Sequence, residues 1–209
     1  MSKLKFPKML SVHWRIKLMD KKILRREFIS RRKNLSAVER DNLSKIITEK
    51  FVATEIFRKS QMIMAYLSMR DEIQLNSLIE KSFALDKKIC IPVIIERGIM
   101  QATLFESFDD LDIGEFNIKT VRADLQKIIE PKKIDCVIVP GVAFDKNCNR
   151  IGMGGGFYDR FLKLTRAKKI ALAFDFQVTE NLPTENFDVA VDMIITERRN
   201  FYVCSREND

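Results

Sequence analysis

Short apolar segments alternate with helical patterns along most of the chain, and this alternation restricts its fold more than any other feature. The apolar segments are QMIMAYL, KICIPVI, MQATLFE, DCVIVPG, KIALAFD and VDMIITE, at residues 61–67, 88–94, 100–106, 135–141, 169–175 and 191–197. Such runs are typical of strands buried on both faces, and Pro92 is expected to end the second of them. We therefore expect a single three-layer α/β domain, with helices flanking a mostly parallel central sheet.

Helical patterns are expected at residues 20–34, 36–51, 75–85, 123–129 and 157–165, with the rest of the stretch 107–133 as loop. Leu24 and Phe28 form an apolar stripe with Leu35 at the start of the chain. Ser36 and Glu39 form a capping box, which predicts where the second helix begins.

Composition favours a globular protein, because 46% of the 209 residues are hydrophobic and 32% are charged. No apolar run approaches the roughly 20 residues of a membrane-spanning helix, and the start of the chain lacks a signal-peptide core. We therefore expect a cytoplasmic protein with no membrane partner. The domain is expected to span residues 21–203, after an N-terminal extension of residues 1–20.

The reactive side chains disfavour two kinds of chemistry. The four cysteines form no CxxC pair and have no zinc-ligand spacing, so Cys90 and Cys136 are expected to be reduced core residues. His13 is the only histidine and lies in the expected extension. Catalysis by a Cys–His or Ser–His pair is therefore disfavoured.

Positive charge is concentrated at the start of the chain. Twelve Lys or Arg and two acids give residues 1–33 a charge of +10, so the remainder carries −2 of the total of +8. Lys21, Arg25 and Arg32 fall on one face of the first expected helix. Such a segment suits nucleic acid, a membrane surface or a polyphosphate, although a basic helical face is most often simply solvated.

The stretch RIGMGGGFYD, residues 150–159, holds four of the chain's seven glycines. It lies between an expected strand and an expected helix, where backbone N–H groups favour an anion. It matches neither the Walker A pattern nor GxGxxG, and a merely mobile loop is the plainer interpretation. Arg150 before the glycines suits phosphate oxygens, and Asp159 after them suits Mg²⁺.

Other acidic residues carry weaker signals. Glu72 lies in the loop after a buried strand, where it is either a surface carboxylate or a group that orients a ligand. Asp188 and Asp192 precede the last strand, and capping of a turn is their plainer role.

Six segments together resemble the 5-formyltetrahydrofolate cyclo-ligase family over about residues 21–197. They are KKILR, YLSMRDEI, KICIPV, VPGVAFDKNCNRIGMGGGFYDRFL, IALAFDFQ and LPTENFDVAVDMIITE. The resemblance implies a NagB/RpiA/CoA-transferase-like α/β fold. It also implies ATP-dependent closure of 5-formyltetrahydrofolate to 5,10-methenyltetrahydrofolate, with Mg²⁺ and release of ADP and phosphate. The formyl oxygen would attack the γ-phosphorus, and the neighbouring nitrogen would then capture the phosphorylated iminium.

The same resemblance implies the roles of individual residues. ATP would be bound by Lys21, Arg25, Arg150, Gly152, Met153, Gly154, Gly155, Gly156, Phe157 and Tyr158, with Lys21 and Arg150 also catalytic. The folate, with or without a polyglutamate tail, would be bound by Leu67, Glu72, Tyr158, Phe174 and Gln177. Asp159 and Asp188 would bind the metal. The protein would act on small molecules as a monomer, without a nucleic-acid partner.

The sequence departs from the family pattern at two positions. Cys148 stands where the family usually has glycine, so Asn147 or Asn149 is expected to supply a positive φ angle. Phe157 replaces a common tyrosine and lacks its hydroxyl.

Two other functional classes remain open. An α/β enzyme acting on a sugar phosphate or a CoA ester would use the same glycine loop but would not need Lys21 and Arg25. A nucleic-acid or ribosome-associated protein would explain the basic N-terminus and leave the glycine loop unexplained.

Overall fold

The computed structural model describes residues 20–114 and 119–203, and within them an eight-stranded sheet forms the middle layer. The strands lie in the order β13-β12-β10-β7-β1-β2-β3-β6, and the five from β12 to β2 are parallel. Their bounds are β1 Met62–Met64, β2 Lys88–Glu96, β7 Cys136–Ile138, β10 Lys168–Leu172 and β12 Met193–Ile195. The antiparallel edge strands are β3 Ile99–Phe105, β6 Ile128–Ile129 and β13 Asn200–Tyr202. The expected mostly parallel sheet is therefore confirmed.

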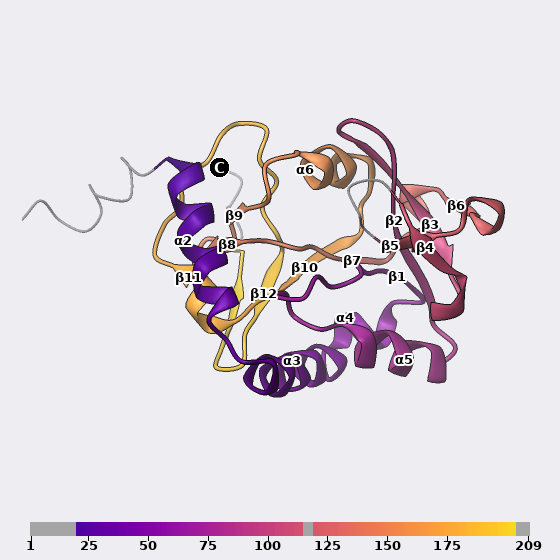
Figure 1. Cartoon of the computed structure of the whole chain (residues 1–209), viewed down its shortest axis with the longest axis horizontal. Helices are drawn as coiled ribbons and strands as arrows, with labels where there is room; N and C mark the ends of the chain where they lie inside the picture. The colour runs from indigo at the N-terminus through magenta and orange to yellow at the C-terminus, as the bar shows by residue number, and fades with distance from the viewer. Residues whose placement is uncertain (1–19, 115–118, 204–209) are drawn as a thin grey trace, which may run out of the picture.

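Helices cover both faces of this sheet (Figure 1). On one face lie α3 (Ala37–Val52), α4 (Glu55–Lys59) and α5 (Asn76–Ala84), and α3 begins with the predicted capping box of Ser36 and Glu39. On the other face lies α6 (Phe157–Phe161), which continues as a 3-10 turn over Leu162–Leu164. The five residues of α4 were not predicted, because so short a helix carries no measurable periodicity.

Successive residues of the parallel strands enter two different cores. Ile63 of β1 packs in the core under α3 and α5, while the next residue, Met64, packs in the core under α6. In β10, Ile170 packs in the first of these cores and Ala171 packs in the second. Because both faces are covered, both residue positions must be apolar, which explains the continuous apolar runs of the sequence.

A second, three-stranded sheet lies beside α2 (Lys21–Lys33). Its central strand β8 (Ala143–Asp145) pairs with β9 (Arg150–Ile151) and with β11 (Val178–Thr179). Leu24 and Phe28 of α2 pack against Val142, Ala143, Ile151 and Leu182 in a third apolar cluster. The glycine loop begins where β9 ends, so this small sheet places the loop against the N-terminal helix.

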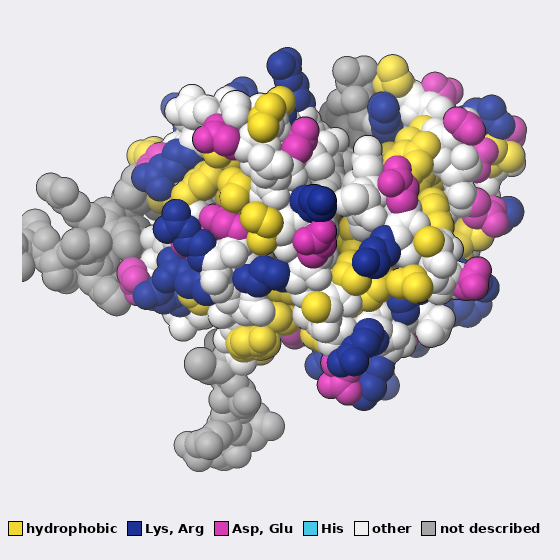
Figure 2. Space-filling model, turned by 90° about the horizontal axis from the view of Figure 1, so that it is seen from below, with side chains coloured by type: hydrophobic (Ala, Val, Ile, Leu, Met, Phe, Trp, Pro, Cys, Tyr) yellow, Lys and Arg dark blue, Asp and Glu magenta, His cyan; other side chains and the backbone are white. Residues whose placement is uncertain are grey.

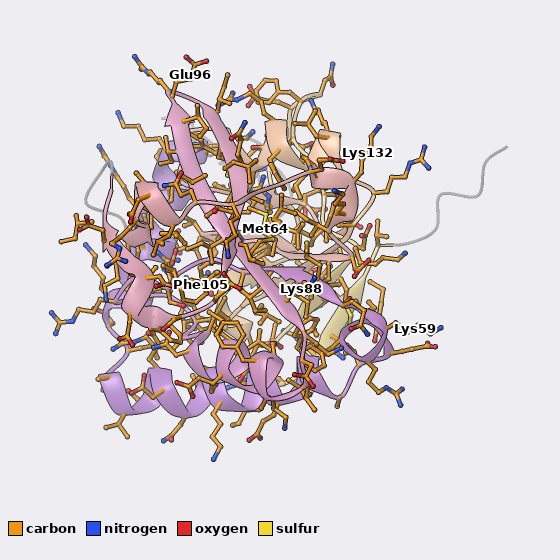
Figure 3. All side chains as sticks on the ribbon, turned by 90° about the vertical axis from the view of Figure 1, so that its right-hand side faces the viewer. Lys59, Met64, Lys88, Glu96, Phe105 and Lys132 are labelled. Atoms are coloured by element: carbon orange, nitrogen blue, oxygen red, sulfur yellow. The ribbon has the colours of Figure 1, made fainter. Side chains whose placement is uncertain are left out.

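The long hairpin of β2 and β3 corrects one prediction. Pro92 lies inside β2, paired with Ala102, and does not end the strand. The register with β1 reaches only Cys90, so beyond that point β2 pairs with β3 alone and tolerates a residue without an N–H. Figure 3, in which Lys88 and Glu96 label the two ends of β2, shows this two-stranded arm.

The segment between β3 and β7 is more ordered than expected. β4 (Leu111–Ile113) and β5 (Lys119–Val121) form a small antiparallel pair. The prediction of a helix at 123–129 is wrong beyond its first turn. Residues Ala123–Leu125 form a 3-10 turn, and Ile128–Ile129 form the strand β6. The exposed edge of β3 supplies hydrogen-bonding partners there, and they outweigh the local helical pattern.

Cys90 and Cys136 are fully buried thiols, as expected for reduced core residues. Burial raises the pKa of Cys90 to about 12. The expected N-terminal extension lies, apart from Asp20, outside the described residues.

Among residues 20–114 and 119–203, no helix is both long and apolar enough to cross a membrane. Figure 2 shows Lys and Arg side chains gathered at the end of the molecule where α2 lies.

Candidate active site

Lys21 lies in the first turn of α2 between two carboxylates. Its Nζ donates to Asp188 Oδ2 at 2.6 Å and to Glu185 Oε2 at 2.7 Å. Burial lowers the pKa of Lys21, but the hydrogen bonds and charges of Asp188 and Glu185 outweigh it, so the pKa is raised overall. The ammonium is therefore held charged and fixed in position.

Arg25, one turn further along α2, holds the glycine loop. Its Nε donates to the carbonyl oxygen of Gly152 at 2.7 Å. Leu24 and Phe28 fix this helix on the small sheet, so the guanidinium has a defined place beside the loop. The structure thus places Arg25 against the glycine loop and Lys21 one turn before it on the same helix, while their predicted role in binding ATP stays a prediction.

The glycine loop presents backbone N–H groups that have no partner among the described residues, although carbonyl oxygens of the loop are bound. Within the described residues, no hydrogen bond uses the N–H groups of residues 152–156. Gly154 and Gly156 have φ angles of 102° and 65°, which side-chain-bearing residues rarely adopt. The tip at Met153 is exposed, and Phe157 lies against Gly155. Since α6 has only five residues, the loop amides, and not a helix dipole, are the groups available to an anion.

Arg150 closes the base of this loop. Its side chain is buried, and Nη2 donates to Asp159 Oδ1 at 2.6 Å. The same Oδ1 accepts the N–H of Val189 at 3.1 Å. Because Asp188 binds Lys21 and the adjacent Val189 binds Asp159, one short segment connects the Lys21 ammonium to the Arg150 guanidinium.

Two buried polar atoms next to the loop have no hydrogen-bond partner in the described part of the chain: Arg150 Nε and the Tyr158 hydroxyl. The Arg150 guanidinium carbon lies 6.0 Å from the centre of the Tyr158 ring. Burial raises the pKa of Tyr158 well above its ordinary value, and the charge of Glu72 raises it further. A buried polar atom without a partner is costly, so a water molecule or a ligand that hydrogen-bonds to both atoms is expected here.

Glu72 lies in the turn that follows β1. Its Oε2 accepts the N–H of Met69 at 3.0 Å, and its Oε1 lies 3.7 Å from Nη1 of Arg32. Burial raises the pKa of Glu72, against the smaller lowering effects of Met69 and Arg32. Its charge raises the pKa of both Tyr66 and Tyr158, so Glu72 lies within electrostatic reach of the helix that follows the glycine loop.

The remaining predicted folate residues lie deeper in the protein. Leu67 is half-buried and packs on the core under α3 and α5. Phe174 is fully buried and stacks on Phe176. Gln177 is 2% exposed and donates from Nε2 to the carbonyl oxygens of Gly141 and Val142. In this conformation Phe174 is packed in the core and Gln177 holds the segment that follows β7, so their contact with a substrate stays a prediction.

The two predicted metal ligands are already paired with cations. Asp159 binds Arg150 and Asp188 binds Lys21, each through one oxygen. Their other oxygens, Asp159 Oδ2 and Asp188 Oδ1, have no partner within the described ranges, which also contain no cluster of three or more Asp, Glu, His or Cys able to hold a metal. This donor set fits a Mg²⁺ ion bound mainly by phosphate and water, and does not fit a cage built of protein ligands alone.

Two arginines were not predicted as part of the site. Arg160 donates from Nε to the carbonyl oxygen of Gly98 and from Nη2 to that of Gly155, both at 2.5 Å, and so ties the β2–β3 turn to the glycine loop. Arg32 donates to Asp71 beside Glu72. The only sequence signals were the place of Arg160 directly after the glycine motif and the shared helix face of Arg32 and Lys21.

The prediction for the turn before Arg150 is wrong. Cys148 itself has a φ angle of 64°, and Asn147 and Asn149 do not supply the positive value. The N–H groups of both asparagines donate to Oδ1 of Asp145, which fixes their conformations and leaves the left-handed position to residue 148. A side-chain-bearing residue costs roughly 1–2 kcal/mol there.

Residues 17–197 match the 5-formyltetrahydrofolate cyclo-ligase family. The chain belongs to this family. The 5-formyltetrahydrofolate cyclo-ligase of Haemophilus influenzae is 31% identical over 171 residues, which are 79% of this chain and 91% of that protein. The mouse 5-formyltetrahydrofolate cyclo-ligase is 30% identical over 189 residues, which are 85% and 93% of the two chains.

Solved structures of methenyltetrahydrofolate synthetases have the same fold as this cyclo-ligase family member. The NMR structure of the Aquifex aeolicus 5,10-methenyltetrahydrofolate synthetase superposes with a TM-score of 0.80 at 30% identity, covering 91% of this chain and 95% of that one. The Mycoplasma pneumoniae 5,10-methenyltetrahydrofolate synthetase gives 0.71 at 26% identity, covering 86% and 99%. The expected family and α/β fold are confirmed, and as a family member the protein is an enzyme of the ligase class.

Proposed function

We propose that the protein converts 5-formyltetrahydrofolate and ATP into 5,10-methenyltetrahydrofolate, ADP and phosphate. The observation that carries this proposal is a loop whose N–H groups at 152–156 have no partner in the described part of the chain, with Arg25 bound to it and Arg150 at its base. Lys21 lies one turn before Arg25 on the same helix. The names of the relatives support the folate half of the reaction. The loop and the cationic side chains beside it support the use of ATP in the reaction.

On the ATP side, positive charge and backbone donors would bind the phosphates. Lys21 and Arg150 would stabilise the charge of the transferred phosphoryl group, while Arg25 keeps the loop on α2. Phosphoryl transfer requires mainly positioning and charge neutralisation, so the near absence of histidine is no obstacle. The carboxylates that now bind Lys21 and Arg150 would share these cations with the incoming phosphates.

On the folate side, Glu72 and Tyr158 would orient the substrate, with Leu67 lining the pocket. Glu72 is held by the Met69 N–H and acts through its charge on Tyr158, whose hydroxyl has no partner in the described part of the chain. We infer that both face the folate, and that Phe174 and Gln177 complete the pocket from the 3-10 turn that follows β10.

The chemistry proceeds in two steps that balance without an added base from histidine. The formyl oxygen attacks the γ-phosphorus, the bond from that phosphorus to the β,γ-bridging oxygen breaks, and ADP leaves. The neighbouring N–H nitrogen then attacks the activated formyl carbon, its proton passes to the departing phosphate, and the carbon–oxygen bond breaks to release that phosphate. Arg150, buried and fixed by Asp159, is suited to the charge that moves onto the phosphoryl oxygens.

Asp159 and Asp188 would hold Mg²⁺ through their unpaired oxygens, with the phosphates and water as further ligands. When bound, the ion would neutralise phosphate charge. We further infer a cytoplasmic, monomeric enzyme that acts on small molecules and not on nucleic acid, and that accepts folates with or without polyglutamate tails.

The test is direct. Purified full-length protein is mixed with 5-formyltetrahydrofolate, Mg²⁺ and ATP, and the methenyl chromophore is followed, with ATP omitted in a parallel reaction. We expect product only with ATP and one ADP for each methenyl group formed. A folded protein that gives no ATP-dependent product would contradict the proposal.

A further inference from the structure

The last turn of α2 carries a buried arginine that contacts the Glu72 turn. Arg32 is 3% exposed, and its Nε and Nη2 both donate to Asp71 Oδ2, at 3.1 and 2.8 Å. Its Nη1 lies 3.7 Å from Oε1 of Glu72, beyond hydrogen-bond distance. Asp71 therefore accepts the hydrogen bonds of the guanidinium, and Glu72 interacts with the guanidinium only through its charge.

The turn that Arg32 contacts is otherwise held by its own backbone. The N–H of Glu72 donates to the carbonyl oxygen of Met69, and the N–H of Met69 donates back to the Glu72 carboxylate. The N–H of Gln74 donates to Ser44 of α3, which anchors the far end of the turn. The Arg32–Asp71 pair anchors the near end to α2.

One helix thus reaches both halves of the proposed site. Lys21 and Arg25 lie in its first two turns, and Arg32 lies eleven residues after Lys21, which is roughly 16 Å along an α-helix. Leu24 and Phe28, between them, are buried against the small sheet, so α2 is fixed along its length. A displacement of α2 at the phosphate end would therefore be transmitted to the Glu72 turn.

We propose that Arg32 is a positioning residue: through Asp71 it holds the Glu72 turn on α2 and so couples folate binding to phosphate binding at Lys21 and Arg25. This inference rests on the proposed function. The coupling is reciprocal, so phosphate ligands on α2 strengthen folate binding and folate strengthens nucleotide binding. Arg32 itself touches neither substrate.

The experiment compares Asp71→Asn and Arg32→Lys with Arg31→Gln in the full-length enzyme. Arg31 pairs with Glu27 on the exposed face of the same helix, so its loss is the matched control. Asp71 is partly exposed and its amide is isosteric, so that variant is expected to fold even if Arg32→Lys does not. KM for both substrates, kcat and the melting temperature are measured for each variant and for the double variant Arg32→Lys/Asp71→Asn.

We expect Asp71→Asn to raise KM for 5-formyltetrahydrofolate about tenfold, the equivalent of one charge-assisted hydrogen bond, with kcat changed less than about threefold. The double variant should be no worse than the poorer single variant, because both changes break the same ion pair. In wild type and Arg31→Gln, a non-hydrolysable ATP analogue should tighten folate binding. In Asp71→Asn this gain should be lost.

Two results would overturn the role of Arg32. One is a folded Asp71→Asn enzyme whose folate KM and response to the ATP analogue match Arg31→Gln. The other is an equal rise in both KM values with a lower melting temperature, which is the signature of general destabilisation. Failure of the wild-type enzyme to turn over folate with ATP would instead contradict the proposed function, so the two failures are distinguishable.

Discussion

Arg150 and Asp159, nine residues apart, are joined by a 2.6 Å hydrogen bond that closes the base of the glycine loop. The guanidinium is almost fully buried, while Asp159 is about one-fifth exposed. The pair fixes both ends of the loop, and Nε of Arg150 has no hydrogen-bond partner among residues 20–114 and 119–203. We therefore expect the proposed ATP side of the site to depend on Arg150 more than on any other residue.

Arg150→Ala should lower kcat/KM for ATP by at least about 100-fold, because one buried donor to a developing charge is commonly worth this much. Arg150→Lys should recover only part of the loss, since an ammonium lacks the planar fork that binds Asp159 and phosphate together. Steady-state kinetics over a range of ATP concentrations measure both effects. Arg122→Ala, which breaks an exposed pair with Asp124, is the control. Unchanged ATP kinetics in a folded Arg150→Ala enzyme would refute the phosphate site.

Lys21→Ala and Glu185→Gln should act in opposite directions on ATP binding. Removing the Lys21 ammonium should raise KM for ATP about tenfold, as expected for a lost charge-assisted hydrogen bond. Removing the charge of the half-exposed Glu185 should lower that KM about twofold, because one competitor for Lys21 is gone. The control is Glu55→Gln on the exposed Lys59 pair. A rise in KM with Glu185→Gln would show that this carboxylate supports Lys21 and does not compete for it.

Arg160→Ala should loosen the glycine loop by releasing it from the β2–β3 turn, and should raise KM for ATP about fivefold with little change in folate KM. Gly98→Ala should have a similar effect from outside the site. The φ angle there is 85°, and an added Cβ would lie 2.5 Å from Nη2 of Arg160. Substitution of the exposed Arg166 is the control. Equal ATP KM values in all these variants would exclude the tie between turn and loop.

Glu72→Gln should stabilise the folded protein while weakening folate binding. Burial raises the pKa of Glu72 above its ordinary value of 4.5, so at neutral pH the folded protein holds an ionised group that it disfavours. The stabilisation from removing this charge is present at pH 7 and decreases as pH falls through the folded pKa towards 4.5. Urea unfolding of both proteins between pH 4 and pH 7 measures it. A difference in unfolding free energy that does not vary with pH would contradict the raised pKa.

The central sheet could be predicted because its strands are buried on both faces, which leaves a continuous apolar signature such as Cys136–Ile138. The small sheet could not. Its strands are only two or three residues long, as in Arg150–Ile151, and pairing with distant segments, not local pattern, defines them. The prediction that Pro92 ends its strand failed for a related reason. Whether a strand tolerates proline depends on which neighbouring strands it pairs with.

Lys21 and Arg150 were named as site residues because they lie in segments that resemble the family, and their roles stay predictions. The site was not predictable where a partner lies far away in sequence. Arg32 meets Asp71 39 residues later, and Arg160 meets Gly98 62 residues earlier. Cys148 shows a third limit, because a closed network around Asp145 can impose a left-handed backbone on a residue that disfavours it.

The unpaired N–H groups of residues 152–156 have a consequence for how occupancy of the site can be observed. Amides without acceptors exchange their hydrogens with solvent at nearly the rate of an unfolded chain, even in a stable protein. If these amides bind phosphate, adding nucleotide should slow deuterium uptake in this one peptide while the strands of the sheet exchange as before. Deuterium uptake by the loop would then report nucleotide binding before any folate is turned over.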